Sequence, residues 1–443
     1  MAQILPPTSY KRYLFNKKMN QIHIQEIEKQ SFLIDDTILS INNAILSLLK
    51  IQDLYLGQNQ FINYVKQILD LIAQDYSIQM EILPKIWNQS FGKLLIDFIK
   101  SENSVEYLTI TLNLIYFLLN DEEAKKFYFE YQLSDLIFQM IPSFSTELQL
   151  ISRCFMVLSN LLPYIDENFQ SFLPELFSQI SLYCNFEDCE LWICQFIHEL
   201  LQVYDISPFY EPISQFFNQI LEKNEFSDQT FLLILKTTTK LQIQTQNHQN
   251  EHINAVIDNI ITIISIQIDD SSPYLIYKFL KFIKNSILFS EKQRIYRYLK
   301  KLTISSFIKI YEEQENPKIT ITVLDIFIEL FKIEKNKNFF CQFDFTLNFD
   351  EDLLSLIIQK FNGKTFSEKQ VVLKLLAELT EFQKIETFNI LTNKNKFIFD
   401  KLIGFAFNSE CYSTAGDCLT FFLNYAEMSL LFENSIVSCP FMS

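Results

Sequence analysis

The sequence predicts an all-α solenoid in which short helices repeat along most of the chain. The 443 residues include only 5 glycines, too few for the turns of a hairpin-rich β protein. The 44 phenylalanines and 20 tyrosines indicate a large buried apolar volume. Apolar residues recur at i, i+3, i+4 and i+7, and short polar turns separate these stretches. Together these observations favour many amphipathic helices packed on one another.

The predicted helices come in pairs, a short first helix followed by a turn and a longer second helix. The first helices lie near Leu94, Leu136, Leu176, Phe216, Ile260, Phe307, Leu354 and Leu402. The second helices lie near Leu114, Leu158, Phe196, Leu235, Phe279, Ile326, Leu376 and Phe421. A unit of about 40–47 residues with two or three helices is the armadillo/HEAT period, and such units stack on a continuous core. We therefore predict an armadillo/HEAT-type right-handed α-solenoid.

Polar turns between the helices predict where helices begin. Asn, Asp, Ser and Glu gather at residues 101–104, 120–123 and 185–188, and such side chains cap helices by accepting unpaired backbone N–H groups. Residues 242–251 are polar and predict a loop between units. Residues 335–351 are rich in phenylalanine and predict a second connection.

The helical periodicity and the charge pattern divide the chain into three predicted segments. Residues 1–36 form a basic leader, residues 37–434 a solenoid of about nine units, and residues 435–443 a C-terminal tail. Residues 1–30 hold five Lys or Arg and two Glu, a net charge of 5 − 2 = +3. Since the formal net charge of the chain is −16, the remainder carries −16 − 3 = −19.

The negative charge is concentrated in one block. Residues 154–222 hold ten Asp or Glu and no Lys or Arg. A block of this sign attracts cationic partners and repels nucleic acid, although an acidic outer face that only keeps the protein soluble is an equal alternative. A basic stretch at residues 278–301 either meets an acidic partner or forms a solvated helix face.

Several kinds of chemistry find little support. The few glycines form no phosphate-binding loop, and the 8 cysteines form no C-x-x-C pair, so we expect reduced, mostly buried thiols. No secretory signal is visible, and Asn254, Asp258 and Asn259 interrupt the longest apolar stretch, so we expect no membrane span. Residues 248–252 match the zinc-peptidase motif H-x-x-E-H, but in a Gln/Asn-rich setting without helical periodicity. We expect no catalytic activity, cofactor or metal.

Two neighbouring units resemble the importin-α family. The segment Met156–Val157–Leu158–Ser159–Asn160–Leu161 is similar to the family pattern W-x-L-S-N-L, with Met156 at the Trp position. Leu173–Pro174–Glu175–Leu176 is similar to L-P-x-L, and it leads to a helix in which Trp192 and Phe196 match the Trp and Tyr of D-x-C-W-x-I-S-Y-L. In the preceding unit Tyr116 takes the Asn position.

The resemblance implies a peptide-binding groove. In the family, Asn amides hold the backbone of an extended peptide, while Trp rings form slots for lysine side chains. The candidate peptide-binding residues are Asn160, Trp192, Met156, Phe196 and Tyr116. Only Asn160 and Trp192 match intact, so the groove is altered, specialised or lost relative to the family.

The leader resembles the importin-β-binding segment that precedes the repeats of that family. The resemblance therefore implies basic peptide or protein cargo, an importin-β-like carrier bound through residues 11–30, and nuclear import between cytoplasm and nucleus. It implies no nucleic-acid or membrane partner. The alternative is a non-catalytic armadillo/HEAT scaffold subunit of a larger protein assembly.

Overall fold

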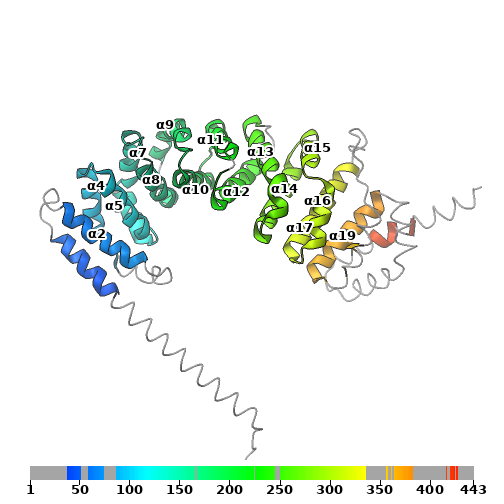
Figure 1. Ribbon diagram of the computed structural model, residues 1–443, viewed down its shortest axis with the longest axis horizontal. Helices are drawn as coiled ribbons and strands as arrows, with labels where there is room; N and C mark the ends of the chain where they lie inside the picture. The colour runs from blue at the N-terminus through cyan, green and yellow to red at the C-terminus, as the bar shows by residue number, and fades with distance from the viewer. Residues whose placement is uncertain are drawn as a thin grey trace, which may run out of the picture. The chain divides into compact units, whose positions relative to one another are not determined.

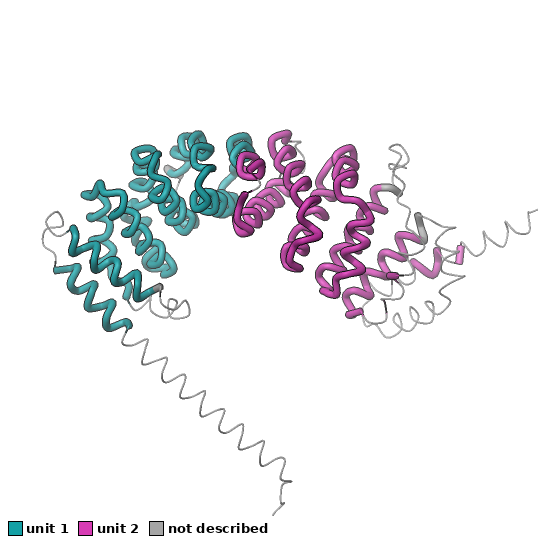
Figure 2. Tube along the Cα trace, viewed as in Figure 1, with its two compact units in different colours: residues 1–216 teal, residues 217–443 magenta. Residues whose placement is uncertain are grey.

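The computed structural model describes residues 37–50, 58–73, 86–164, 167–223, 225–244, 250–335 and 364–382, with shorter pieces at 356–357, 361, 416, 420–424 and 426–427. Helices are the regular elements throughout this part of the chain, and it contains no strand. The chain divides into two compact units, residues 1–216 and 217–443 (Figure 2). The predicted leader and the predicted C-terminal tail both lie outside the described residues.

Unit 1 consists of two rows of helices (Figure 1). One row, named here the inner row, holds α2, α5, α8 and α10, each packed on the next. Helices α4, α6 and α7 form the second layer, together with α9, which leads into the short 3-10 turn that contacts α10. The bounds are α2 Gln58–Ala73, α4 Gln89–Ser101, α5 Val105–Leu118, α6 Glu122–Glu130, α7 Leu133–Ser143, α8 Leu148–Leu161, α9 Leu173–Gln179 and α10 Glu187–Val203.

Unit 2 repeats the arrangement with its own inner row of α12, α14, α17 and α19. Helix α13 packs against both α12 and α14, and α15 packs on α13, so these helices form the second layer with α16. Helix α11 (Tyr210–Glu222) contains the boundary between the units. The remaining bounds are α12 Asp228–Gln244, α13 Glu251–Gln267, α14 Pro273–Phe289, α15 Lys292–Lys301, α16 Ile304–Glu313, α17 Pro317–Lys335 and α19 Phe366–Phe382.

The predicted helix pairs are confirmed wherever the structure describes them. Leu94 and Leu114 lie in α4 and α5, and the series continues through Phe307 in α16 and Ile326 in α17. Leu354 and Leu402 lie outside the described residues. Helices α6 and α15 add a third, short helix to two of the units, as an armadillo repeat allows. The predicted fold class is confirmed.

The predicted caps are confirmed only in part. Asp121 Oδ1 accepts hydrogen bonds from the backbone N–H groups of Glu123 at 2.9 Å and Ala124 at 3.0 Å. Ser104 precedes α5 but makes no cap bond with its side chain. The Glu102 carboxylate accepts the N–H groups of Asn103 and Ser104, at 2.8 and 2.7 Å, and so orders the turn that leads into α5. Helix α10 has no side-chain cap bond at its start.

The loop predicted at residues 242–251 is shorter than expected. Helix α12 continues to Gln244, and α13 begins at Glu251. Gln242 is buried, and its Nε2 donates to Ser286 Oγ on α14 at 3.3 Å. Burial on a neighbouring helix therefore overrides the polar composition of this segment.

Phenylalanine rings pack between helices of the two rows and between neighbouring helices of one row. In unit 1, the rings of Phe61 and Phe98 stack with their centroids 4.0 Å apart. In unit 2, Phe231 of α12 meets Phe279 of α14 edge to face at 5.7 Å, a contact between neighbouring helices of the inner row. All four side chains are buried. The abundant aromatic residues thus supply the continuous core that stacked repeats require.

Candidate peptide-binding surface

The candidate surface lies on the inner row of unit 1. Helices α5, α8 and α10 pack in succession, and the second layer covers one side of them. The side chains of Tyr116, Asn160 and Trp192 come from these three helices in turn, and all three are partly exposed. The structure therefore brings the two intact motif residues and Tyr116 onto neighbouring helices.

Tyr116 and Trp192 contact each other across α8. Their ring centroids lie 5.4 Å apart with an interplanar angle of 70°, a favourable edge-to-face geometry. Because α8 packs between α5 and α10, this aromatic pair bridges over it. A lysine side chain could not lie against the part of the Trp192 ring that Tyr116 covers. Tyr116 thus occupies part of the space that the resemblance assigns to cargo.

Asn160 keeps hydrogen-bonding capacity at this surface. Its Nδ2 donates to the carbonyl oxygen of Met156 at a long 3.5 Å. Within the described part of the chain, its Oδ1 accepts no hydrogen bond. An amide with a free acceptor and a weakly engaged donor can pair with the backbone of an extended peptide.

Met156 and Phe196, by contrast, lie in the core rather than on the surface. Met156 is 3% exposed and Phe196 is 0% exposed. The Phe196 ring meets Phe155 at 5.5 Å and Phe169 at 6.4 Å. Burying large apolar side chains between stacked helices stabilises the fold, so neither side chain is available to a peptide in this arrangement. The prediction that these two residues line a groove is corrected accordingly.

The acidic block does not lie on one face. On α10, Glu187 and Asp188 are exposed, whereas Glu190 is only 3% exposed. Glu175 of α9 and Glu211 of α11 are exposed on helices outside the inner row. The block therefore contributes acids both to the candidate surface and to helices outside the inner row.

A cation also lies at this surface, which the sequence analysis did not single out. Arg153 of α8 forms an ion pair with Asp188 of α10, with Nη2 and Oδ2 3.5 Å apart. The Nη1 atom of Arg153 lies 3.9 Å from the Met156 sulfur. In the sequence, Arg153 directly precedes the block without Lys or Arg, and this position could have indicated that a base lies beside the acids. It offsets part of the negative charge that would attract a basic peptide.

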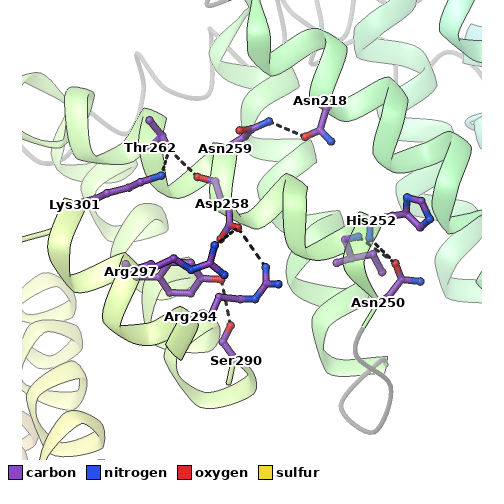
Figure 3. Close-up of polar contacts among 12 residues, drawn as sticks. Asn218, Asn250, His252, Asp258, Asn259, Thr262, Ser290, Arg294, Arg297 and Lys301 are labelled. Carbon is purple, nitrogen blue, oxygen red and sulfur yellow. Dashed lines mark hydrogen bonds and ion pairs between the residues drawn. The ribbon is translucent and has the colours of Figure 1, made fainter. Parts of the chain in front are cut away.

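The basic stretch at residues 278–301 is divided between two helices of unit 2. Three lysines belong to α14, and the other bases belong to α15. Arg294 and Arg297 of α15 both pair with Asp258 Oδ2 of α13, at 3.3 and 3.6 Å (Figure 3). Lys301 Nζ donates to Thr262 Oγ1 at 2.6 Å. Arg294, Arg297 and Lys301 therefore fasten α15 to α13.

The same region contains the segment that matched the zinc-peptidase motif. Asn250 caps α13 by accepting the N–H groups of His252 at 3.0 Å and Ile253 at 3.2 Å (Figure 3). His248 lies outside the described residues. Among the residues that are described, no group of three or more His, Cys, Asp or Glu side chains is placed to hold a metal ion.

The cysteines of unit 1 are buried thiols. Cys154, Cys184, Cys189 and Cys194 are all buried, and none of these four forms a disulfide. Burial, reinforced by the nearby Asp188 carboxylate, raises the pKa of Cys189 to about 12. A thiol with such a pKa stays protonated near neutral pH and is a poor nucleophile.

In the part of the chain that the structure covers, no helix is both long and apolar enough to cross a bilayer.

Two layers of stacked helical repeats define an α-solenoid of the armadillo/HEAT type. Solved structures that share this arrangement include SYS-1, with a TM-score of 0.54, 14% identity, and coverage of 87% of this chain and 80% of that chain. SYS-1 in its complex with POP-1 matches with a TM-score of 0.53 and 15% identity, over 87% of this chain and 80% of that chain. An engineered protein matches with a TM-score of 0.52 and 8% identity, over 87% of this chain and 99% of that chain. No protein-family model and no curated protein matches the chain. At these identities the likeness concerns the fold alone.

Proposed function

We propose that this protein is a non-catalytic interaction scaffold that binds an extended peptide segment on the inner row of unit 1. The observation that carries the proposal is the partly exposed set of Tyr116, Asn160 and Trp192 on three successive helices. Asn160 supplies a free acceptor for a peptide backbone, and the two aromatic rings supply contact area. SYS-1, which shares the fold, has been solved with POP-1, and this supports a protein partner here.

The more specific form of the proposal is an importin-α-like adaptor. It binds basic nuclear-localisation peptides on this surface, binds an importin-β-like carrier through residues 11–30, and moves between cytoplasm and nucleus. The L-S-N-L segment around Asn160 and the exposed acids of α10 favour it. The Tyr116 contact requires that a lysine side chain either displace this ring or approach Trp192 from its uncovered side.

A binding assay with the full chain tests both forms. Fluorescein-labelled peptides of lysine-rich, uncharged and Asp/Glu-rich composition are titrated at low and at moderate salt. We expect the lysine-rich peptide to bind, more weakly as salt rises, and Trp192→Ala to weaken it by about tenfold. Trp87→Phe is the matched control, because Trp87 packs against Phe127 and Tyr128 in another part of unit 1.

The outcomes separate the two forms. Binding of the uncharged peptide with the same dependence on Trp192 supports a scaffold and contradicts an adaptor for basic cargo. If no peptide depends on Trp192, the proposed surface is wrong. Deletion of residues 11–30 is expected to abolish pull-down of an importin-β-like carrier, and unchanged pull-down contradicts that part of the adaptor form.

A further inference from the structure

A second surface of different chemistry lies on the inner row of unit 2. Five lysines project from two neighbouring helices, α12 and α14. The lysines of each helix are three or four residues apart, so they lie on one side of it, and each side chain is partly or fully exposed. We name this set the α12–α14 lysine surface; its members are Lys236, Lys240, Lys278, Lys281 and Lys284.

The packing of the helices places these lysines side by side. Helix α13 returns the chain between α12 and α14 and contacts both (Figure 1), so α12 and α14 run in the same direction. The bond between Gln242 and Ser286 sets their register. Lys240 and Lys284 each precede that bond by two residues, about 3 Å along the axis. Neighbouring helix axes lie about 8–10 Å apart, so the lysines form adjacent columns.

Few negative charges accompany this surface. Helix α14 contains no acid, and the one acid of α12 is Asp228 in its first turn. Lys284 Nζ pairs with Asp325 Oδ2 of α17 at 2.5 Å. Lys236, Lys240 and Lys281 form no ion pair or hydrogen bond with any described residue.

The three lysines add positive charge that no carboxylate of the described residues pairs with. Acids outnumber Lys and Arg by 53 to 37 in the whole chain, and some exposed bases, such as Lys66 and Lys309, have carboxylate partners. Like charges within a Debye length repel each other. An anionic partner would relieve this repulsion.

Aromatic side chains adjoin the lysines. Tyr274 is 57% exposed and Tyr277 is partly exposed, both on α14. Lys278 Nζ lies 5.1 Å from the Tyr274 ring centroid and 5.7 Å from that of Tyr277. Exposed tyrosine beside basic groups offers apolar contact area as well as charge, a combination that suits a protein partner.

We propose that the α12–α14 lysine surface binds an extended, acidic peptide segment of a partner protein. Carboxylates along such a segment pair with the two lysine columns, while its apolar side chains pack on Tyr274 and Tyr277. The proposal does not depend on the peptide surface of unit 1, whose charge has the opposite sign.

Fluorescence anisotropy on the full chain tests the proposal. The probe is a fluorescein-labelled peptide of Glu and Asp with one Leu and one Phe, with a lysine-rich peptide and a single-stranded oligonucleotide of equal charge for comparison. We expect the acidic peptide to bind in a salt-dependent way. The variant Lys236→Gln/Lys240→Gln/Lys281→Gln should lose about tenfold or more in affinity, and the corresponding triple change to Arg should restore it.

The matched control removes three positive charges from the second layer of the same unit. Lys300→Gln/Lys301→Gln/Lys309→Gln should leave acidic-peptide binding nearly unchanged, and circular dichroism melts confirm that each variant is folded. Trp192→Ala should also have no effect, which separates this site from the one proposed on unit 1. An equal loss in both triple variants overturns the proposal, as does unchanged binding in the first one. Tighter binding of the oligonucleotide than of the peptide would assign the surface to nucleic acid instead.

Discussion

Loss of the Glu368 carboxylate is predicted to destabilise unit 2. Glu368 belongs to α19, is 2% exposed, and accepts a hydrogen bond from Thr320 Oγ1 of α17 at 2.6 Å. It also accepts the N–H and the hydroxyl of Thr365, both at 2.9 Å, and pairs with Lys364 at 2.8 Å. The Thr365–Glu368 pair is a capping box. One carboxylate therefore both starts α19 and ties it to α17.

The pKa of Glu368 gives the size of the effect. Burial alone would raise this pKa, but the hydrogen bonds from Lys364, Thr320 and Thr365 outweigh burial and lower it from 4.5 to about 2. At about 1.4 kcal/mol per pKa unit, the ionised carboxylate contributes about 3 kcal/mol to the free energy of unfolding. Because the folded-state pKa is lowered, this contribution is present above about pH 4.5 and is lost as the pH falls toward 2.

Urea unfolding followed by circular dichroism tests this value. We expect Glu368→Gln to lower the free energy of unfolding of unit 2 by about 2–3 kcal/mol near pH 7, and by roughly half of that or less near pH 3. Glu313→Gln, at an exposed carboxylate that ends α16, is the control and should change stability little at either pH. A difference between wild type and Glu368→Gln that is the same at both pH values would refute the reasoning, because the carboxylate would then contribute nothing through its charge.

Two further substitutions test packing in unit 1. A Cβ atom at Gly92 would lie 2.6 Å from Trp87 Cη2 and 2.9 Å from Phe127 Cε1. Gly92→Ala should therefore lower the free energy of unfolding, measured in urea, by about 1–3 kcal/mol. A gain in stability would contradict this, because it would mean that the two rings move aside freely. Tyr116→Ala removes the ring that covers part of Trp192 and a pairing energy of about 1 kcal/mol. In a Trp87→Phe background, Trp192 emission should shift to the red and iodide quenching should increase, whereas an unchanged spectrum would contradict the contact.

The repeat architecture could be predicted because its signal is distributed over the whole chain. Each pair of helices has its own apolar periodicity, so Leu136 and Leu158 were placed in helices without knowledge of their neighbours. Helix α15 was not separated from the basic stretch, because its only buried residues are Ile295, Tyr298 and Leu299 among many charges. A short helix that packs on one neighbour leaves too few apolar positions for a sequence pattern to detect.

The candidate site was less predictable, since it depends on which parts of a helix remain uncovered. Motif spacing placed Asn160 and Trp192 on the surface of the inner row, but the same spacing suggested Met156 and Phe196, which neighbouring helices bury. The contact of Tyr116 with Trp192 joins helices that are two repeats apart in sequence, with α8 between them. Neither burial nor a contact of that range is encoded in a local motif.

The bonds that join neighbouring repeats also bear on how the protein folds. Asn218 and Asn259 are joined across 41 residues, as are Lys284 and Asp325, and Thr320 and Glu368 across 48. Each partner is thus supplied by the next repeat, so loop-closure entropy stays small although the chain is long. During synthesis, a repeat can dock as soon as its successor has emerged, without waiting for the C-terminus. Folding can therefore begin at any stable pair of repeats and spread to its neighbours.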